Sequence, residues 1–263
     1  MEKCFENFDV VEMIFGQLDL ASLNRCAKVC QSWKALINQG GQVWMRKIRE
    51  VMTAHPREST GKTELHWAAE QGLDELCQAL VQVMEIKSPN DNTARWTPLH
   101  LAALNGHLKT CHTLLLFLDD VNPRDAWGRT PLHWAAIKGN AGLCRVLMMN
   151  NKTVISAKDQ DHWTPLHYAA DFGHLMVVNL LLPKMVEKNP RDFDGWTPLH
   201  SAATNGHLGI CQTMLFHWPR GFVTDDFGRT PYTMAQANEQ TDVVRFFEER
   251  LEMENWMCPA QDY

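Results

Sequence analysis

Apolar residues recur along most of the chain at spacings that predict short, paired helices. In one stretch, Leu99, Ala102 and Ala103 stand at steps of three and four, which places them on one face of a helix. A second apolar set follows at the same steps after an intervening Gly106: Cys111, Leu114 and Leu115. The pattern therefore predicts two helices joined by a short turn, each with one apolar face.

Start and stop signals frame the first helix of each pair. Thr97 precedes Pro98, and Thr is a good N-cap while Pro fits the first helical position. A glycine nine residues after the threonine supplies the left-handed conformation that ends a helix. This glycine occurs in five copies: Gly72, Gly106, Gly139, Gly173 and Gly206.

The two-helix pattern is repeated. Its first residue recurs every 33 or 34 residues, at Thr63, Thr97, Thr130, Thr164, Thr197 and Thr230. The last copy is degraded, because Tyr232-Thr233 stands where earlier copies carry Leu-His. An Asp-x-x-Gly sequence, as in Asp192 to Gly195, suits a type I turn before each unit. One such unit cannot bury its apolar face alone, so we expect the units to stack into a curved solenoid.

The Thr-Pro-Leu-His core at this period resembles the ankyrin repeat. The resemblance runs from about Glu58 to about Glu254. It implies an all-α fold of helix–turn–helix units with short hairpin loops, and a role in binding other proteins. We assign 58–254 to six ankyrin units, with the degraded last unit as a cap, and 255–263 to a C-terminal tail.

Cysteines and histidines follow the repeat phase and do not converge on a site. Four cysteines share one position: Cys77, Cys111, Cys144 and Cys211. Two other copies carry Val178 and Val244 there, so we predict a small, buried, apolar site with reduced thiols. The Thr-x-Leu-His histidines are His66, His100, His133, His167 and His200. The ankyrin resemblance implies that they are structural hydrogen-bonding residues. We therefore expect no metal, no cofactor and no catalytic centre.

The first 49 residues are out of phase with the repeats and predict short helices. One apolar stripe at helical spacing consists of Val10, Val11, Ile14, Phe15 and Leu18. A second follows at steps of three or four: Leu23, Cys26, Val29, Cys30 and Trp33. Gly40-Gly41 then interrupts the pattern.

The order of motifs in this segment resembles an F-box. The resemblance rests on Ile14-Phe15, Leu18-Asp19, Val29-Cys30-x-x-Trp33 and Val43-Trp44, although Glu6-Asn7 stands where the family usually has Leu-Pro. It implies a small three-helix domain over 1–49, followed by a linker over 50–57. F-box proteins dock onto the Skp adaptor, which joins a cullin scaffold carrying a RING protein. The expected adaptor-binding residues are Val11, Ile14, Phe15, Leu18, Leu23, Val29 and Trp33. The alternative is a plain helical cap on the solenoid.

The ankyrin resemblance also implies where a protein substrate binds, because hairpin tips and first helices line the concave side in that family. The expected substrate-binding residues are Trp96, Leu104, Trp127, Ile137, Trp163, Phe172, Phe193, Trp196 and Phe227. Such an aromatic groove could hold a cationic side chain by cation–π contact. For Trp96, Trp163 and Trp196 the alternative is packing between neighbouring hairpins.

Charge and composition limit the classes of partner that we expect. The net charge is −6, so no basic field favours nucleic acid or an anionic membrane. No apolar run is long enough to span a bilayer, and the sequence from Met1 to Glu6 lacks signal-peptide features, so we expect a cytoplasmic or nuclear protein. The leading hypothesis is a non-catalytic substrate receptor of an SCF-type (cullin–RING) ubiquitin ligase. The alternative is a non-catalytic ankyrin scaffold or inhibitor whose N-terminal helices only cap the solenoid.

Overall fold

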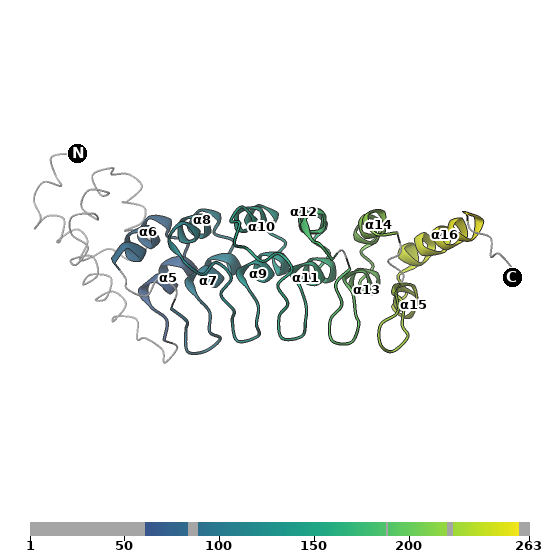
Figure 1. Ribbon diagram of the computed structural model, residues 1–263, viewed down its shortest axis with the longest axis horizontal. Coiled ribbons are helices and arrows are strands. Elements are labelled where there is room, and N and C mark those ends of the chain that lie inside the picture. Colours follow the sequence, from purple (N-terminus) through teal and green to yellow (C-terminus); the bar gives the residue numbers. More distant parts are fainter. Residues whose placement is uncertain (1–60, 84–88, 188, 220–222, 258–263) are drawn as a thin grey trace, which may run out of the picture.

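A computed structural model describes residues 61–83, 89–187, 189–219 and 223–257 of the chain. In this part of the chain the regular structure is entirely helical, with twelve α-helices and one short 3-10 helix and no strand. Figure 1 shows an elongated array in which two rows of helices run side by side and hairpin loops project from one side. The predicted F-box over 1–49 and the linker over 50–57 lie outside the described residues.

The two rows alternate along the chain. The inner row, next to the hairpins, consists of α5 (Glu64–Glu70), α7 (Pro98–Leu104), α9 (Pro131–Ile137), α11 (Pro165–Asp171), α13 (Pro198–Thr204) and α15 (Pro231–Ala237). The outer row consists of α6 (Asp74–Val83), α8 (Leu108–Phe117), α10 (Ala141–Met148), α12 (Leu175–Leu181) with η2 (Leu182–Lys184), α14 (Leu208–His217) and α16 (Thr241–Met257). Each inner helix packs on the next inner helix and on its own outer partner. This stacking is the solenoid that the repeat period predicts.

The inner helices begin and end where the sequence signals predict. Thr97 has extended dihedral angles at the N-cap of α7, and Pro98 occupies the first turn. At the other end, Gly106 has φ 75°. The His107 N–H then donates to the Ala102 carbonyl at 2.9 Å, which closes the helix as in a Schellman motif. In the last unit Glu239 takes this left-handed position with φ 58°, where earlier units have glycine.

The core is continuous along the array. Leu99, Ala102 and Ala103 are fully buried, and the small alanines allow neighbouring helices to approach closely. Cys111 and its three counterparts in the described repeats are buried, free thiols, as predicted. The prediction for Val244 was wrong, because this side chain is only half-buried. It lies on α16 in the last of the described units, and within the described residues no further unit packs over that helix (Figure 1).

Candidate protein-binding surface

Each hairpin is held rigid by an aspartate that binds the backbone of its own turn. The Asp159 Oδ1 atom accepts the Asp161 N–H at 3.0 Å and the Trp163 N–H at 2.8 Å. Asp192 does the same for Asp194 and Trp196. The Gly195 N–H also donates to the Asp192 carbonyl at 3.3 Å, which closes a β-turn at the position that the Asp-x-x-Gly sequence predicts. One carboxylate oxygen of each aspartate therefore binds the backbone of its own turn, which holds the shape of the hairpin. The other oxygen binds a side chain, from Tyr168 at Asp159 and from Trp163 at Asp192.

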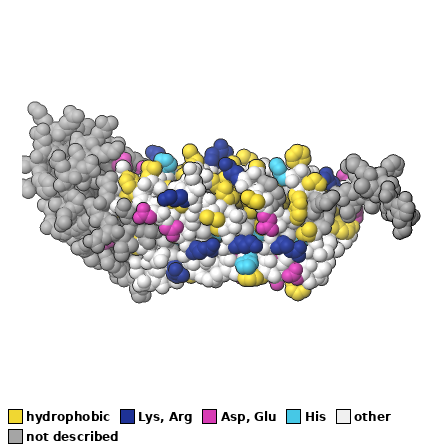
Figure 2. Space-filling view, in the orientation of Figure 1, with side chains coloured by type: hydrophobic (Ala, Val, Ile, Leu, Met, Phe, Trp, Pro, Cys, Tyr) yellow, Lys and Arg dark blue, Asp and Glu magenta, His cyan; other side chains and the backbone are white. Residues whose placement is uncertain are grey.

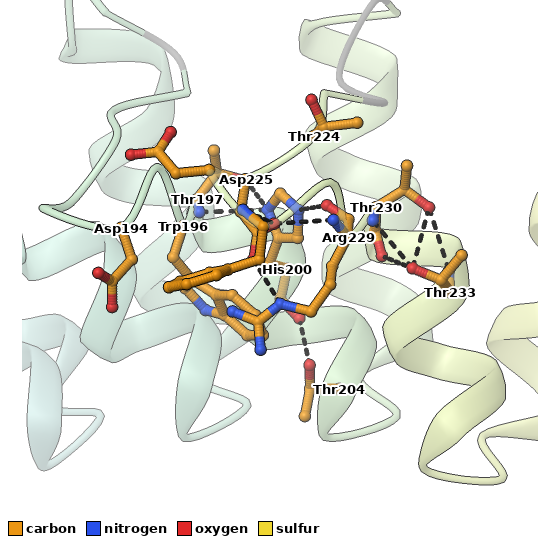
Figure 3. A network of polar contacts seen from close by, with 12 residues as sticks. Asp194, Trp196, Thr197, His200, Thr204, Thr224, Asp225, Arg229, Thr230 and Thr233 are labelled. Atoms are coloured by element: carbon orange, nitrogen blue, oxygen red, sulfur yellow. Dashed lines mark hydrogen bonds and ion pairs between the residues drawn. The ribbon is translucent and has the colours of Figure 1, made fainter.

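The repeated histidines join each unit to the next. The Thr130 N–H donates to His133 Nδ1 at 3.0 Å, and His133 Nε2 lies 3.1 Å from the Trp163 carbonyl in the next hairpin. The ring therefore has its proton on Nε2, which donates to that carbonyl. Figure 3 shows another copy, in which His200 bridges the Thr197 backbone and the Arg229 carbonyl. This arrangement confirms the structural role that the ankyrin resemblance implies.

A second set of cross-repeat links was missed by the sequence analysis. It is formed by three histidines that directly follow a helix-ending glycine. The Nε2 atom of His107 lies 2.9 Å from the Glu70 carbonyl, and that of His207 lies 3.0 Å from the Asp171 carbonyl. His174 makes the matching contact at 3.0 Å with the Ile137 carbonyl. The Gly-His pair recurs in the sequence, and this recurrence could have predicted the links. The imidazoles bond to carbonyls that the inner helices leave without an intrahelical partner at their C-terminal ends.

Burial keeps the capping histidines neutral. It lowers the pKa of His133 to about 4 and that of His167 to about 3, from an ordinary value of 6.5. The imidazoles are committed to two structural hydrogen bonds each, so they are not placed to exchange protons with a substrate. Their chemistry is that of neutral cross-links between units.

The depressed pKa values predict that the repeat array loses stability in mild acid. Between pH 6.5 and about 4 the unfolded chain binds protons at His133 that the folded chain does not, and for His167 this window extends to about 3. The free energy of unfolding should therefore fall as the pH drops below 6.5, by about 2 kcal/mol per such histidine at pH 5. Urea midpoints measured from pH 7.5 to 5.0 test this, and a constant midpoint would contradict it.

The cysteines of the described repeats are equally inert. Burial raises the pKa of the Cys144 and Cys211 thiols to about 12, so neither is a thiolate at neutral pH. Among the residues that the structure describes, no group of His, Cys, Asp and Glu side chains is arranged to hold a metal ion. In the same residues no helix is long and apolar enough to cross a membrane.

The predicted substrate-binding residues fall into two classes by exposure. Trp127, Phe193 and Phe227 on the hairpins are exposed, with 46%, 62% and 68% of their surface open to solvent. Phe172 is also exposed and is the C-cap of α11, not a residue inside the helix. The remaining five are half-buried: Trp96, Leu104, Ile137, Trp163 and Trp196. The exposed class is open to contact with a partner.

The three half-buried tryptophans have partners within the solenoid. The Trp163 Nε1–H donates to Asp192 Oδ2 at 2.9 Å, and the Trp196 Nε1–H donates to Ser201 Oγ at 2.9 Å. Trp96 packs edge-to-face against Trp134, with ring centroids 5.6 Å apart. The contact of Trp163 crosses to the next hairpin, as the packing alternative predicts, whereas Trp96 packs on α9 of the next unit and Trp196 bonds within its own unit. The exposed rings remain the stronger binding candidates, although Phe193 stacks on His162 with ring centroids 3.7 Å apart.

Two arginines of the chain itself occupy the cation–π positions of this aromatic surface. The Arg129 guanidinium carbon lies 5.6 Å from the Trp127 ring centroid, 5.3 Å from that of Trp134 and 5.1 Å from that of Tyr168. Arg229 lies in the same way over Trp196, at 5.2 Å, as Figure 3 shows. At these rings the protein therefore supplies a cation of its own, and the binding of a partner's cation in this groove stays a prediction.

The predicted adaptor-binding residues belong to the N-terminal segment, which the structure does not describe. Val11, Ile14, Phe15, Leu18, Leu23, Val29 and Trp33 all lie outside the described residues.

Comparison with known families agrees with the repeat geometry. The ankyrin-repeat model matches three stretches, at residues 20–125, 114–192 and 177–254. The chain belongs to the ankyrin-repeat family. The same comparison finds no F-box domain.

Several curated proteins are similar to parts of the ankyrin protein. It is 31% identical over 144 residues to the probable 26S proteasome regulatory subunit p28 of Saccharomyces cerevisiae, covering 51% of this chain and 63% of that protein. It is 49% identical over 39 residues to F-box/SPRY domain-containing protein 1 of Drosophila willistoni, covering 14% of this chain and 15% of that protein. It is 31% identical over 141 residues to transient receptor potential cation channel subfamily A member 1 of Homo sapiens, covering 52% of this chain and 12% of that protein. The chain thus spans less than two thirds of each of these relatives.

Proposed function

We propose that this ankyrin protein is the substrate-recognition subunit of an SCF-type ubiquitin ligase. Its N-terminal segment would bind the Skp adaptor, and through it the cullin and the RING protein, while its hairpins bind the protein to be ubiquitinated. The observation that carries the proposal is the F-box pattern that includes Val29-Cys30-x-x-Trp33 and ends in Val43-Trp44, ahead of a protein-binding solenoid. A match of 39 residues to a protein named for its F-box supports it.

The exposed hairpin aromatics support the substrate-binding half of this proposal. Trp127, Phe193 and Phe227 lie on rigid turns and belong to no core cluster. Exposed aromatic side chains on a preorganised scaffold are typical anchors of protein interfaces, because they bury a large area at a small cost in conformational entropy. The role inferred here is therefore capture of a protein, with no chemical step performed by this chain.

Truncating the hairpin anchors should weaken substrate capture without unfolding the solenoid. We expect Trp127→Ala or Phe193→Ala to cost about 1–3 kcal/mol of binding free energy, which is the usual scale for an aromatic anchor. The measurement is the dissociation constant for a substrate identified by proximity labelling.

A matched control is available on the outer helices. Phe216, on α14, is 79% exposed, so Phe216→Ala removes a similar ring from another surface. We expect this variant to keep the wild-type affinity. Full affinity in the Trp127→Ala, Phe193→Ala double variant, together with a loss in Phe216→Ala, would move the site to the outer helices.

One observation favours a second function, that of a plain ankyrin scaffold or inhibitor. The match to the ankyrin model begins at residue 20, inside the segment that resembles an F-box. Under this alternative the N-terminal helices cover the end of the array and bind no adaptor. A pull-down with the Skp adaptor separates the two proposals, because only the F-box reading predicts a complex.

A further inference from the structure

Basic side chains from three successive units form a row whose bonds join four hairpins. Arg124, Lys158 and Arg191 occupy one repeat position, six residues before the threonine of each unit. The Arg124 Nη1–H donates to the Lys158 carbonyl at 2.6 Å, and the Lys158 Nζ–H donates to the Arg191 carbonyl at 2.9 Å. Arg191 continues the series by donating to the Thr224 carbonyl at 2.7 Å. Figure 2 shows a row of Lys and Arg side chains across the hairpin part of the solenoid.

The positive charge of this basic row is largely uncompensated. Within the described residues, neither Arg124 nor Lys158 forms an ion pair, and Arg191 has one exposed pair, with Asp226 at 3.4 Å. The nearby carboxylates of Asp125 and Asp159 are buried and hold their own turns. A cationic strip on a chain with net charge −6 favours an anionic partner.

The side chains of the basic row are already oriented before a partner binds. Each side chain is already oriented by a bond to the next hairpin, so less rotamer entropy is lost when a partner binds. An arginine has five N–H donors and a lysine has three, and Arg124 commits only Nη1 in its contacts with Gly128 and Lys158. Donors therefore remain for carboxylate oxygens of a partner.

The repeat spacing selects the conformation of that partner. Helices packed side by side lie about 8–10 Å apart, and each unit adds one such step to the row. A polyproline II helix has three residues per turn and rises about 9.3 Å over them, so its residues i, i+3 and i+6 lie on one side at matching distances. In a β-strand, residues i and i+3 point to opposite faces. Backbone phosphates of a nucleic acid strand follow at a much closer spacing.

We propose that the basic row binds an acidic, proline-rich segment of a substrate protein in the polyproline II conformation, with carboxylates at every third residue. The inference rests on the proposed function for the role of the hairpins in substrate capture, and it names the substrate class. It does not depend on the adaptor.

The test uses the full chain and two fluorescent peptides of equal composition. One contains three consecutive Glu-Pro-Pro triplets, and the other has the same three glutamates side by side followed by the six prolines. Fluorescence anisotropy should show about tenfold tighter binding of the triplet peptide, because exposed ion pairs each contribute modestly. The Arg124→Gln, Lys158→Gln, Arg191→Gln variant should lose this preference. Lys109→Gln, Lys138→Gln, Arg145→Gln, which removes the same charge from exposed positions elsewhere, should keep it.

A variant that should gain affinity keeps the proposal testable even if the triple variant fails to fold. Thr224 occupies the next place in the row and is exposed, so Thr224→Arg should add a fourth cation. We expect this variant to bind a four-triplet peptide several-fold tighter than the wild type does, with no such gain for the three-triplet peptide. Equal affinity for the two arrangements of glutamate, or no gain with Thr224→Arg, would overturn the proposal. If it fails while Trp127→Ala still weakens substrate capture, the proposed function stands without it.

Discussion

Replacing Leu18 and Leu23 with aspartate should abolish co-purification of the full chain with the Skp adaptor. Under the F-box proposal both leucines face the adaptor in an apolar contact. Two carboxylates buried there without partners would cost several kcal/mol each, and every 1.4 kcal/mol is a tenfold loss of affinity. The adaptor should therefore be undetectable after a co-expression pull-down that retains it with the wild-type chain.

The control for this experiment places the same charges on the ankyrin solenoid. Leu116 on α8 and Phe216 on α14 are both well exposed, so the Leu116→Asp, Phe216→Asp variant should keep the adaptor. Circular dichroism should show the same ankyrin helicity in both double variants. Retention of the adaptor by Leu18→Asp, Leu23→Asp would mean that 1–49 is not an adaptor-binding F-box.

Replacing His133 with alanine should destabilise the solenoid by about 3–5 kcal/mol. The ring is fully buried, accepts the Thr130 N–H at 3.0 Å and donates to the Trp163 carbonyl at 3.1 Å. Its removal leaves the buried Thr130 N–H unpaired, at about 1–3 kcal/mol, and adds a cavity. It also takes one of two donors from the Trp163 carbonyl, which still accepts the Asp159 N–H at 2.9 Å. The carbonyl belongs to the next unit, so the loss falls on an interface between repeats, which is where a solenoid gains its cooperativity. Urea unfolding followed by circular dichroism measures the effect.

His112 provides the matched control. It lies on α8 and is exposed, so His112→Ala should change the free energy of unfolding by less than about 0.5 kcal/mol. The same stability in both variants would show that the histidine links do not hold the units together.

The fold was largely predictable because several local signals coincide in every repeat. Thr97, Pro98 and Gly106 each specify one backbone feature of α7 and its end, and all three features are present in the structure. The exposure of Val244 was not predictable from its repeat position, because it depends on whether another unit covers it. A repeat pattern describes an average unit and carries no information about the end of the array.

The candidate site was predictable only in part. The hairpin aromatics follow from the repeat phase. The phase also separates the exposed rings three or four residues before the threonine, such as Trp127, from the half-buried tryptophans directly before it, such as Trp196. The setting of Arg129 was not predictable, because the three rings around it come from its own hairpin, from α9 and from α11. The basic row was missed for the same reason, since Arg124 meets the Lys158 carbonyl only after the units have stacked.

Reconstituted ubiquitin transfer would show whether this chain brings a substrate to the ligase. The full chain is combined with the Skp adaptor, the cullin, the RING protein and a substrate found by proximity labelling. We expect the wild-type chain to support ubiquitination of that substrate. The Leu18→Asp, Leu23→Asp variant and the Trp127→Ala, Phe193→Ala variant should each reduce ubiquitination strongly, the first because it loses the adaptor and the second because it loses the substrate. Equal ubiquitination with and without the wild-type chain would contradict the account.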